Sequence, residues 1–302
     1  MIIVSKDMKS LRYFVITFLS VCIAIIANPI KPQSLYERID SLAKTKNLTL
    51  GISAWQGEKI FEYNDAVKFP LMSVFKLHVC LTALYKMQEE NLTENDSILI
   101  KRKQLQEDTY SPLRKDKLDK HFKMSYCDLI YYTLVLSDNN TCDILIDYCG
   151  GIAKVDNYIH SLGVTDFNLQ ETEATMHKDV DKSYNNWANP HSVNKLLKKI
   201  TVEPLLNEFY RSIFLNNMQL CQTGTDKIKA GLPQDIVMMH KTGSIQSING
   251  NVIADNDAAI IQTKNGEWLY LTVFIKDSKE TPTTNAKVIS QATEILYSWF
   301  NE

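Results

Sequence analysis

The sequence has no excess of basic residues and no internal repeats. Its 302 residues include 33 Lys and Arg and 35 Asp and Glu, which gives a net charge of −2 and an isoelectric point near 6.3. Proteins that bind nucleic acid through its phosphates carry clustered positive charge. We therefore predict no nucleic-acid partner. With 45% hydrophobic residues, the composition is typical of a globular protein with one large or two modest domains.

Metal-binding patterns are also absent from the sequence. It contains neither C-x-x-C nor H-E-x-x-H, and its six histidines are scattered, so we predict no metal and no other cofactor. Of the six cysteines, five follow Cys22, and an odd number in an exported protein leaves at least one unpaired. We interpret these five as small buried apolar residues. If one disulfide forms, we expect Cys80 to pair with Cys127.

The N-terminus has the layout of a secretory signal peptide. Three basic residues precede an uncharged run over 13–26, and the small residue Ala27 follows it. We predict cleavage near Ala27 and export to the periplasm, because the run is shorter than the roughly 20 residues of a membrane-spanning helix. A retained anchor and lipidation at Cys22 are the alternatives. No later segment is apolar enough to span a membrane, so we expect no span in the mature chain.

A serine and a lysine begin the most informative stretch, Ser73-Val74-Phe75-Lys76. It follows Pro70 and precedes the apolar run 77–84, which predicts the first turn of a buried helix. Residues three apart share a helix face, so Ser73 and Lys76 should meet. A buried lysine, whose pKa desolvation lowers, can activate a serine hydroxyl as a base or stabilise the forming alkoxide. Alone, this short pattern also arises by chance.

Strand patterns lie at both ends of the chain and helical patterns lie between them. Apolar runs predict strands over 48–55, 59–63, 236–240, 252–262 and 268–276, the last two joined by a hairpin at Asn265-Gly266. Gly150-Gly151 predicts the C-terminal end of a helix over 140–148. We predict an antiparallel sheet flanked by terminal helices, with an inserted all-helical domain. The predicted boundaries are a signal peptide over 1–27, a sheet domain over 28–66 and 217–302, and the helical insertion over 67–216. A groove between them is the default site.

Four patterns occur along the chain in a recognisable order. They are Ser73-x-x-Lys76, Ser137-Asp138-Asn139, Glu173 in a polar stretch, and Lys241-Thr242-Gly243-Ser244 on a predicted strand. From about residue 34 to the C-terminus, the sequence resembles the class A serine β-lactamases. The resemblance implies an α/β two-domain fold shared with penicillin-binding proteins. It also implies hydrolysis of penicillins and cephalosporins through a serine acyl-enzyme, which gives antibiotic resistance.

The resemblance extends to the extended-spectrum branch that contains the PER and VEB enzymes. Its further carriers are Phe69-Pro70, Thr109-Tyr110-Ser111-Pro112, Cys142-Asp143-Ile144-Leu145, Met176-His177, Asn186-Trp187-Ala188, Thr223-Gly224 and His240-Lys241. In other class A enzymes an asparagine usually stands where this sequence has His177. We expect a monomer that takes a β-lactam antibiotic and a catalytic water.

The resemblance assigns a role in acylation to each matched residue. Ser73 is the nucleophile, with Lys76 beside it, and the backbone N–H groups of Ser73 and Ser244 stabilise the oxyanion. The Ser137 hydroxyl passes a proton to the leaving nitrogen. Lys241 polarises Ser137 and attracts the substrate carboxylate, which Thr242 of the Lys241-Thr242-Gly243 strand also binds. Asn139 holds the substrate side-chain amide and orients Lys76.

The resemblance makes Glu173 the base that activates water for deacylation and also assigns it a part in acylation, through a water. His177 would fix that water. Glu171 is the alternative acid, and we choose Glu173 because Met176 and His177 follow it at the spacing of the branch. We interpret Asp143 as a structural anchor of the loop that carries Glu173, or of the turn at Ser137.

Three features differ from the family pattern or have an equally simple structural interpretation. Tyr110 lines the entrance by resemblance, but it is equally interpreted as a partly buried loop residue. Lys227 stands where the branch has a carboxylate-binding arginine, and lysine lacks the two-pronged guanidinium. No arginine precedes Glu173 to fasten the neck of its loop, so we expect a wider cavity that admits oxyimino-cephalosporins. We interpret the remaining histidines as structural, namely His78, His121, His160, His191 and His240.

Two other functions share part of this pattern. A penicillin-binding D,D-peptidase has the same serine, lysine and Lys-Thr-Gly strand but deacylates penicillin slowly. A covalent β-lactam sensor would need a membrane-spanning segment after the signal peptide. Glu173 argues against the peptidase, because a base near the acyl bond gives a hydrolase that releases its product. Against the sensor, we find no such segment after the signal peptide.

Overall fold

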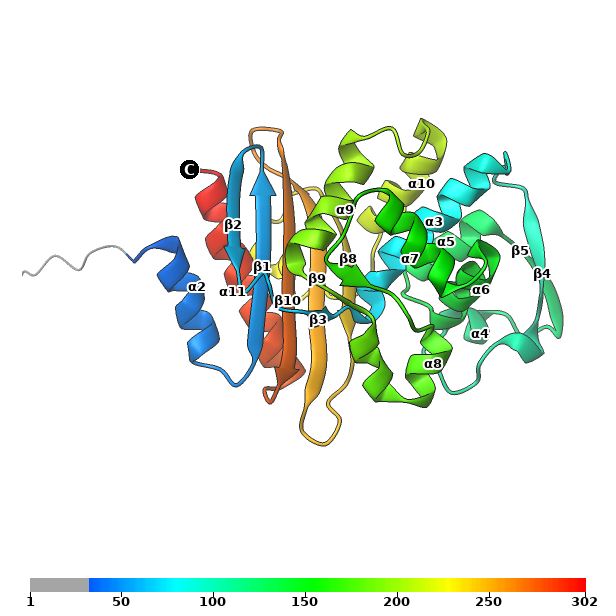
Figure 1. The fold of residues 1–302 in the computed structure, drawn as a ribbon, viewed down its shortest axis with the longest axis horizontal. Coiled ribbons are helices and arrows are strands. Elements are labelled where there is room, and N and C mark those ends of the chain that lie inside the picture. Colours follow the sequence, from blue (N-terminus) through cyan, green and yellow to red (C-terminus); the bar gives the residue numbers. More distant parts are fainter. Residues whose placement is uncertain (1–32) are drawn as a thin grey trace, which may run out of the picture. The chain divides into compact units, whose positions relative to one another are not determined.

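Five antiparallel strands from the two ends of the sequence form the central sheet of the computed structural model, which describes residues 33–302 (Figure 1). The strand order is β2-β1-β10-β9-β8. The bounds are β1 Thr49–Gln56, β2 Lys59–Tyr63, β8 Met238–Ser244, β9 Val252–Gln262 and β10 Trp268–Ser278. The expected signal peptide, its cleavage near Ala27 and the alternative lipidation of Cys22 lie outside the described residues.

The two faces of the sheet bury two different apolar clusters, because successive side chains of a strand point to opposite faces. On β10, Leu271 and Val273 pack with helices α2 (Leu35–Lys44) and α11 (Pro282–Phe300). Tyr270 and Phe274 belong to the cluster on the other face, which continues into the helical block. The sheet is therefore covered on both faces, with the terminal helices on one of them.

The helical block is organised around α3 (Lys76–Glu89), of which almost every residue is buried. Apolar residues all round a helix require partners on every side. These partners include α5, α6, α7 and α10, while α9 packs on β1 and β10. The bounds are α4 Pro112–Asp116, α5 Tyr126–Leu134, α6 Asn139–Cys149, α7 Ile152–Ser161, α8 Glu173–Lys178, α9 Pro190–Val202 and α10 Glu208–Gln219.

The helical block also contains strands, so the expectation of an all-helical insertion is wrong in this respect. The pair β4 (Ser97–Lys101) and β5 (His121–Ser125) lies at its far end in Figure 1. A second small sheet joins β3 (Phe69–Pro70), β7 (Trp187–Ala188) and β6 (Phe167–Asn168). The strands β4 and β5 are largely exposed and the other three have only two residues each, and such segments give a weak alternation signal. Four 3-10 turns complete the described part: η1 Met72–Phe75, η2 Arg102–Gln104, η3 Val180–Asn185 and η4 Ile228–Gly231.

Two turn predictions are confirmed by the backbone. Gly150 ends α6 in the left-handed conformation, with φ of 91°, and its N–H bonds to carbonyls of the last turn. Gly266, with φ of 84°, lies in the turn between β9 and β10. The domain boundaries at 66 and 217 remain a prediction.

All five cysteines in the described residues are free, so the conditional pairing of Cys80 with Cys127 is wrong. Cys80 is fully enclosed in the middle of α3, whereas Cys127 lies half-buried in the first turn of α5. Four of the five are buried, as expected of small apolar residues. Within residues 33–302, no helix has the length and apolarity to cross a membrane.

Candidate active site

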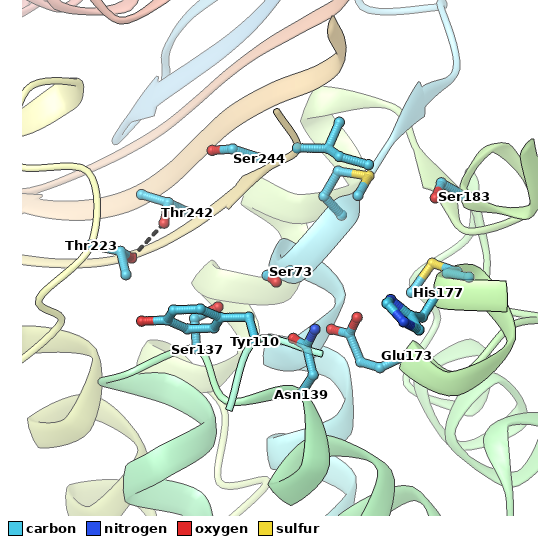
Figure 2. Close-up of a pocket in the computed structure, with 13 residues that line it drawn as sticks. Ser73, Tyr110, Ser137, Asn139, Glu173, His177, Ser183, Thr223, Thr242 and Ser244 are labelled. Atoms are coloured by element: carbon cyan, nitrogen blue, oxygen red, sulfur yellow. Dashed lines mark hydrogen bonds between the residues drawn. The ribbon is translucent and has the colours of Figure 1, made fainter. Parts of the chain in front are cut away.

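A cavity of about 310 Å³ brings together residues from segments far apart in the sequence. Figure 2 shows Ser73, Asn139 and Glu173 facing one another, with Thr223 and Thr242 across the pocket. Eight of the predicted site residues line it: Ser73, Tyr110, Ser137, Asn139, Glu173, His177, Thr242 and Ser244. Lys76, Lys241, Gly243 and Lys227 are absent from the lining. The sequence analysis did not predict Met72, Met176, Ser183, Thr223 or Ile245, which complete it.

Ser73 lies on the 3-10 turn η1, not in the first turn of an α-helix as expected. Met72 before it has φ of 45°, a backbone conformation uncommon for a residue with a side chain. The buried Asn256 side chain fastens this turn, because its Nδ2 donates to the carbonyls of Pro70 at 2.7 Å and Leu71 at 3.2 Å. Only asparagine or glutamine has such an amide, but a lone buried Asn on a strand gives no sequence signal.

Gly243 lets β8 approach η1 closely. A Cβ on Gly243 would lie 2.5 Å from the Leu71 carbonyl oxygen and 2.9 Å from the Ser73 backbone nitrogen. Such contacts are too short for any side chain, so this position requires glycine. The result is that Ser244, the next residue, flanks the same cavity as Ser73.

Lys76 begins α3 and is fully buried beneath Ser73. Its Nζ lies 3.0 Å from Ser73 Oγ, 2.8 Å from the Ser137 carbonyl oxygen and 2.7 Å from Asn139 Oδ1. It also lies 2.8 Å from Glu173 Oε1. An ammonium has three protons, so these four oxygens exceed its donors. The expected contact between Ser73 and Lys76 is present.

The protonation of Lys76 differs from the expectation. Burial lowers its pKa, but the charge and hydrogen bond of Glu173, together with the nearby Cys142 and Asp138, outweigh burial and leave the pKa of Lys76 above its usual value. In this arrangement Lys76 is an ammonium. The sequence could not show this, because the partner lies 97 positions further along the chain.

Ser137 and Lys241 face Lys76 from the other side of the site. Ser137 has φ of 58°, and Asp138 after it begins α6 by accepting the Thr141 N–H at 2.9 Å. Lys241 Nζ donates to Ser137 Oγ at 2.8 Å and to the Thr242 carbonyl at 2.8 Å. Burial lowers the pKa of Lys241 to about 8, and within residues 33–302 no carboxylate forms an ion pair with its ammonium.

The loop that carries Glu173 is anchored to the helical block by Asp143 on α6. Its carboxylate accepts the backbone N–H of Glu173 and of Ala174, both at 2.8 Å. Burial, and then the Glu173 charge, raise the pKa of Asp143 to about 7. Glu171 lies elsewhere, with Oε1 2.9 Å from Asn185 Nδ2, and does not line the cavity. The geometry thus distinguishes the two candidate acids.

The neck of this loop is closed by strand pairing and side-chain amides, without the arginine found in most family members. Phe167 and Asn168 on β6 pair with Ala188 and Trp187 on β7. Asn186 Oδ1 accepts the N–H groups of Gln170 and Glu171, both at 2.8 Å. His191 adds an ion pair, with Nε2 3.2 Å from Asp166 Oδ2.

Lys227 does not reach the cavity surface. Its buried ammonium lies 2.5 Å from Asp255 Oδ1 and donates to Ser244 Oγ at 2.7 Å. The carboxylate-binding role expected of Lys227 is therefore available only through Ser244. Asp255 was not predicted, because a single acid on a strand gives no pattern.

The entrance is formed by Tyr110 and His177, which are both exposed. Tyr110 is 55% exposed, so its alternative interpretation as a partly buried residue is wrong. Asn139 is already occupied on both ends of its amide, since Nδ2 donates to Thr109 Oγ1 at 2.8 Å and Oδ1 accepts from Lys76. Among the residues that the structure describes, no group of three or more His, Cys, Asp or Glu could hold a metal ion.

Comparisons with known proteins agree with this architecture. The model of the beta-lactamase enzyme family matches residues 34–300. A beta-lactamase of Bacteroides uniformis is 39% identical over 94% of this chain and 98% of its own length. The extended-spectrum beta-lactamase PER-1 of Pseudomonas aeruginosa is 30% identical over 94% of this chain and 92% of its own. A crystal structure of a class A beta-lactamase from Bacteroides cellulosilyticus superposes with a TM-score of 0.86 at 41% identity, over 88% of this chain and 97% of the other.

Proposed function

The chain belongs to the class A β-lactamase family and hydrolyses the β-lactam ring, and we propose that Ser73 opens this ring and Glu173 directs the water that releases the product. One observation carries the assignment. Ser73 Oγ and Glu173 Oε1 both contact the same Lys76 ammonium, at 3.0 and 2.8 Å. The nucleophile of the first step and the base of the second thus share one cation in one cavity.

In acylation, the Ser73 oxygen attacks the lactam carbonyl and must lose its proton. Because Lys76 is an ammonium in the free enzyme, Glu173 is the group able to accept the proton, through a water or through Lys76 itself. The backbone N–H groups of Ser73 and Ser244 then stabilise the oxyanion. The close approach of Gly243 to η1 supports this pairing of donors.

The nitrogen of the opening ring leaves with the help of Ser137. Its hydroxyl lies 2.8 Å from Lys241 Nζ, and its backbone carbonyl lies 2.8 Å from Lys76 Nζ. Because this hydroxyl accepts a hydrogen bond from Lys241, its own proton is free to pass to the leaving nitrogen and can be replaced from the Lys76 side. Ser137 is thus the proton donor in this proposal.

Deacylation needs a water between Glu173 and the acyl carbonyl. Asp143 holds the backbone of Glu173, which fixes the position of its carboxylate on the cavity wall. His177 projects beside Glu173 (Figure 2) and is placed to hydrogen-bond the same water. This water is the feature that makes the enzyme release its product.

The substrate carboxylate binds at the side of the cavity that β8 and the nearby Thr223 form, which we call the strand wall. Thr223, Thr242 and Ser244 present three hydroxyls there, and the charge of Lys241 lies directly behind them. Lys227 acts through Ser244. Its ammonium donates to Ser244 Oγ, and the Ser244 hydroxyl in turn donates to Asp255 at 3.0 Å. The three hydroxyls and the charge of Lys241 thus take the place of an arginine guanidinium that would pair directly with the substrate carboxylate.

Hydrolysis of a chromogenic cephalosporin by the purified protein tests the nucleophile. Ser73→Ala should lose turnover to the uncatalysed level and form no covalent adduct, whereas wild type should turn over repeatedly. Ser183→Ala is a matched control, because Ser183 lines the same cavity but lies away from Lys76. Full turnover by Ser73→Ala would overturn the assignment.

The substrate range that we propose includes oxyimino-cephalosporins. Its support is the neck of the Glu173 loop, which β6, β7 and Asn186 close without an arginine, and the likeness to PER-1, named as extended-spectrum. Comparing kcat/KM for cefotaxime with that for benzylpenicillin tests this. A cefotaxime rate near background would leave a penicillin-selective enzyme.

We further propose that the enzyme acts in the periplasm as a monomer. Support for export comes from the basic and apolar composition of residues 1–27. Cell fractionation with N-terminal sequencing should find a mature protein that begins near residue 28, and size-exclusion chromatography should give one protomer. Retention in the membrane fraction would instead favour lipidation at Cys22.

A further inference from the structure

A cysteine, a histidine and an aspartate form a second chemical cluster beside the active site. Cys221 follows the end of α10, His240 lies on β8 and Asp257 lies on β9. None of the three has a role in the proposed mechanism. The sequence analysis interpreted Cys221 as a small apolar residue and His240 as structural.

The histidine of this cluster lies between the acid and the thiol. His240 Nδ1 is 3.0 Å from Asp257 Oδ1, and the imidazole also hydrogen-bonds Cys221. His240 and Asp257 are almost completely buried, at 2% and 0% exposure. A second contact holds the acid, because Asp257 Oδ2 accepts the Ile228 N–H at 3.2 Å. An imidazole backed by a carboxylate takes a proton readily, and this leaves the sulfur as a thiolate.

The charged groups around Cys221 act in the same direction. Burial raises its pKa, but the hydrogen bond and charge of His240 and the charge of Lys241 outweigh burial and lower the pKa of Cys221 to about 6. Burial lowers the pKa of His240, and Asp257 raises it to about 10. The thiolate and the imidazolium stabilise one another.

The pKa of each of the other described cysteines shifts in the opposite direction, upward. Burial raises the pKa of Cys80, Cys142 and Cys149, and these thiols stay protonated in the core of the helical block. Cys127 is more accessible, yet its pKa is also raised by burial and by the nearby Asp128. Reactivity follows the thiolate, so exposure and reactivity point to different cysteines in this protein.

A chain of contacts connects Cys221 with the substrate wall. Cys221 Sγ lies 3.4 Å from Thr223 Oγ1, which lies 2.5 Å from Thr242 Oγ1 (Figure 2 shows the threonine pair). Both threonines line the cavity. A group attached to the sulfur would therefore displace Thr223 and remove its contact with Thr242.

We propose that Cys221 is a site of thiol–disulfide exchange with small disulfides, and that the mixed disulfide weakens binding of the β-lactam. The Cys221 thiolate attacks one sulfur of the small disulfide, a new S–S bond forms, and the second sulfur leaves as a thiolate. Atoms and electrons balance, because the small disulfide is the oxidant. Cys221 keeps 9% of its surface exposed, and the exchange requires the segment 222–224 to open locally and admit the reagent. The effect on binding rests on the proposed role of Thr242.

The test treats the purified enzyme with glutathione disulfide at pH 7 and maps the adduct by mass spectrometry of peptides. We expect one glutathione on Cys221, a rise of about tenfold in KM for a chromogenic cephalosporin as a hydrogen-bonding wall is lost, and recovery with dithiothreitol. Cys221→Ser should keep its own KM unchanged by the reagent. The matched control Cys127→Ser should still be modified and inhibited.

Three results would overturn the proposal: no adduct, an adduct on Cys127 in place of Cys221, or an adduct on Cys221 that leaves KM unaltered. A separate variant distinguishes this from a failure of the proposed function. If Thr242→Val left KM unchanged, the role of Thr242 in substrate binding would be wrong, while the adduct map would still decide the reactivity of Cys221.

Discussion

The active site has a buried lysine on each of two sides: Lys76 on the helical wall, which α3 and the Glu173 loop form, and Lys241 on the strand wall. The two lysines have different partners. The helical wall carries Lys76 in contact with the Glu173 carboxylate at 2.8 Å. The strand wall carries Lys241, which donates to the Ser137 hydroxyl and to the Thr242 carbonyl, both at 2.8 Å. Both lysines are completely buried. Burial is therefore the same, and the partner differs.

This difference sets opposite pKa shifts. The pKa of Lys76 is raised because Glu173, with smaller contributions from Cys142 and Asp138, outweighs burial, and the pKa of Lys241 is lowered to about 8 by burial. The helical wall thus keeps a fixed proton that both Ser73 and Glu173 contact, and the strand wall keeps a charge that depends on pH. The comparison assigns bond-making and proton transfer to the first wall and substrate attraction to the second.

The largest effect should follow loss of the lysine on the helical wall. In Lys76→Met, Ser73 and Glu173 lose the cation that both contact, and we expect kcat/KM to fall by about 10³-fold or more. Steady-state hydrolysis of a chromogenic cephalosporin measures it. Lys86→Met on the same helix is the control and should retain activity. A loss of less than tenfold in Lys76→Met would contradict the assignment of bond-making and proton transfer to the helical wall.

The strand wall should show itself in the pH dependence. An amine is charged below its pKa, so Lys241 loses its charge as the pH rises through about 8, and kcat/KM for an anionic β-lactam should fall above that pH. In Lys241→Arg the guanidinium stays charged, so this limb of the profile should disappear. Lys276→Arg on β10 is the control. An unchanged alkaline limb in Lys241→Arg would assign the titration to another group.

The buried pair Lys227 and Asp255 behind the strand wall should matter more for stability than for binding. Lys227→Met leaves a buried carboxylate without its partner, which costs about 3 kcal/mol of unfolding free energy. Adding Asp255→Asn should recover part of the loss in urea denaturation. If Lys227→Met instead raised KM tenfold with stability unchanged, Lys227 would bind substrate directly.

The smallest effect concerns the neck of the Glu173 loop. Burial lowers the pKa of His191, but Asp166 and Asp65 raise it above the usual value. A raised pKa means that this stabilisation is complete below about pH 6.5 and is lost as the pH rises through the folded-state value. The difference in melting temperature between wild type and His191→Gln should thus shrink from pH 5.5 to pH 8.5. The corresponding difference in unfolding free energy should stay below about 1 kcal/mol, because the His191–Asp166 ion pair is partly exposed. A difference that does not vary with pH would exclude the ion pair.

Sequence patterns predicted those parts of the fold that repeat or that depend on turn chemistry. The strand β9 was predicted with its observed bounds, and Gly150 and Gly266 lie at the turns expected of them. The pair β4 and β5 was missed, since short strands with one exposed face lack a continuous apolar run. The family assignment from four motifs is confirmed by the comparisons.

What the sequence could not supply is the pairing of charges across the fold. Lys227 was expected at the substrate, and its partner Asp255 lies 28 positions away on β9. The raised pKa of Lys76 and the lowered pKa of Cys221 have the same origin, because Glu173 and His240 approach them only after folding. Motifs identify chemical groups, whereas contacts between distant segments set their protonation.

The division of labour between the steps is tested most directly by Glu173→Gln, which keeps the shape of the side chain and removes the base. Mass spectrometry should follow the protein for minutes after addition of benzylpenicillin. We expect wild type to return to its own mass as the substrate disappears. Glu173→Gln should instead gain the mass of one penicillin on Ser73 and keep it. Turnover at the wild-type rate with no accumulated adduct would contradict the assignment of Glu173 as the base.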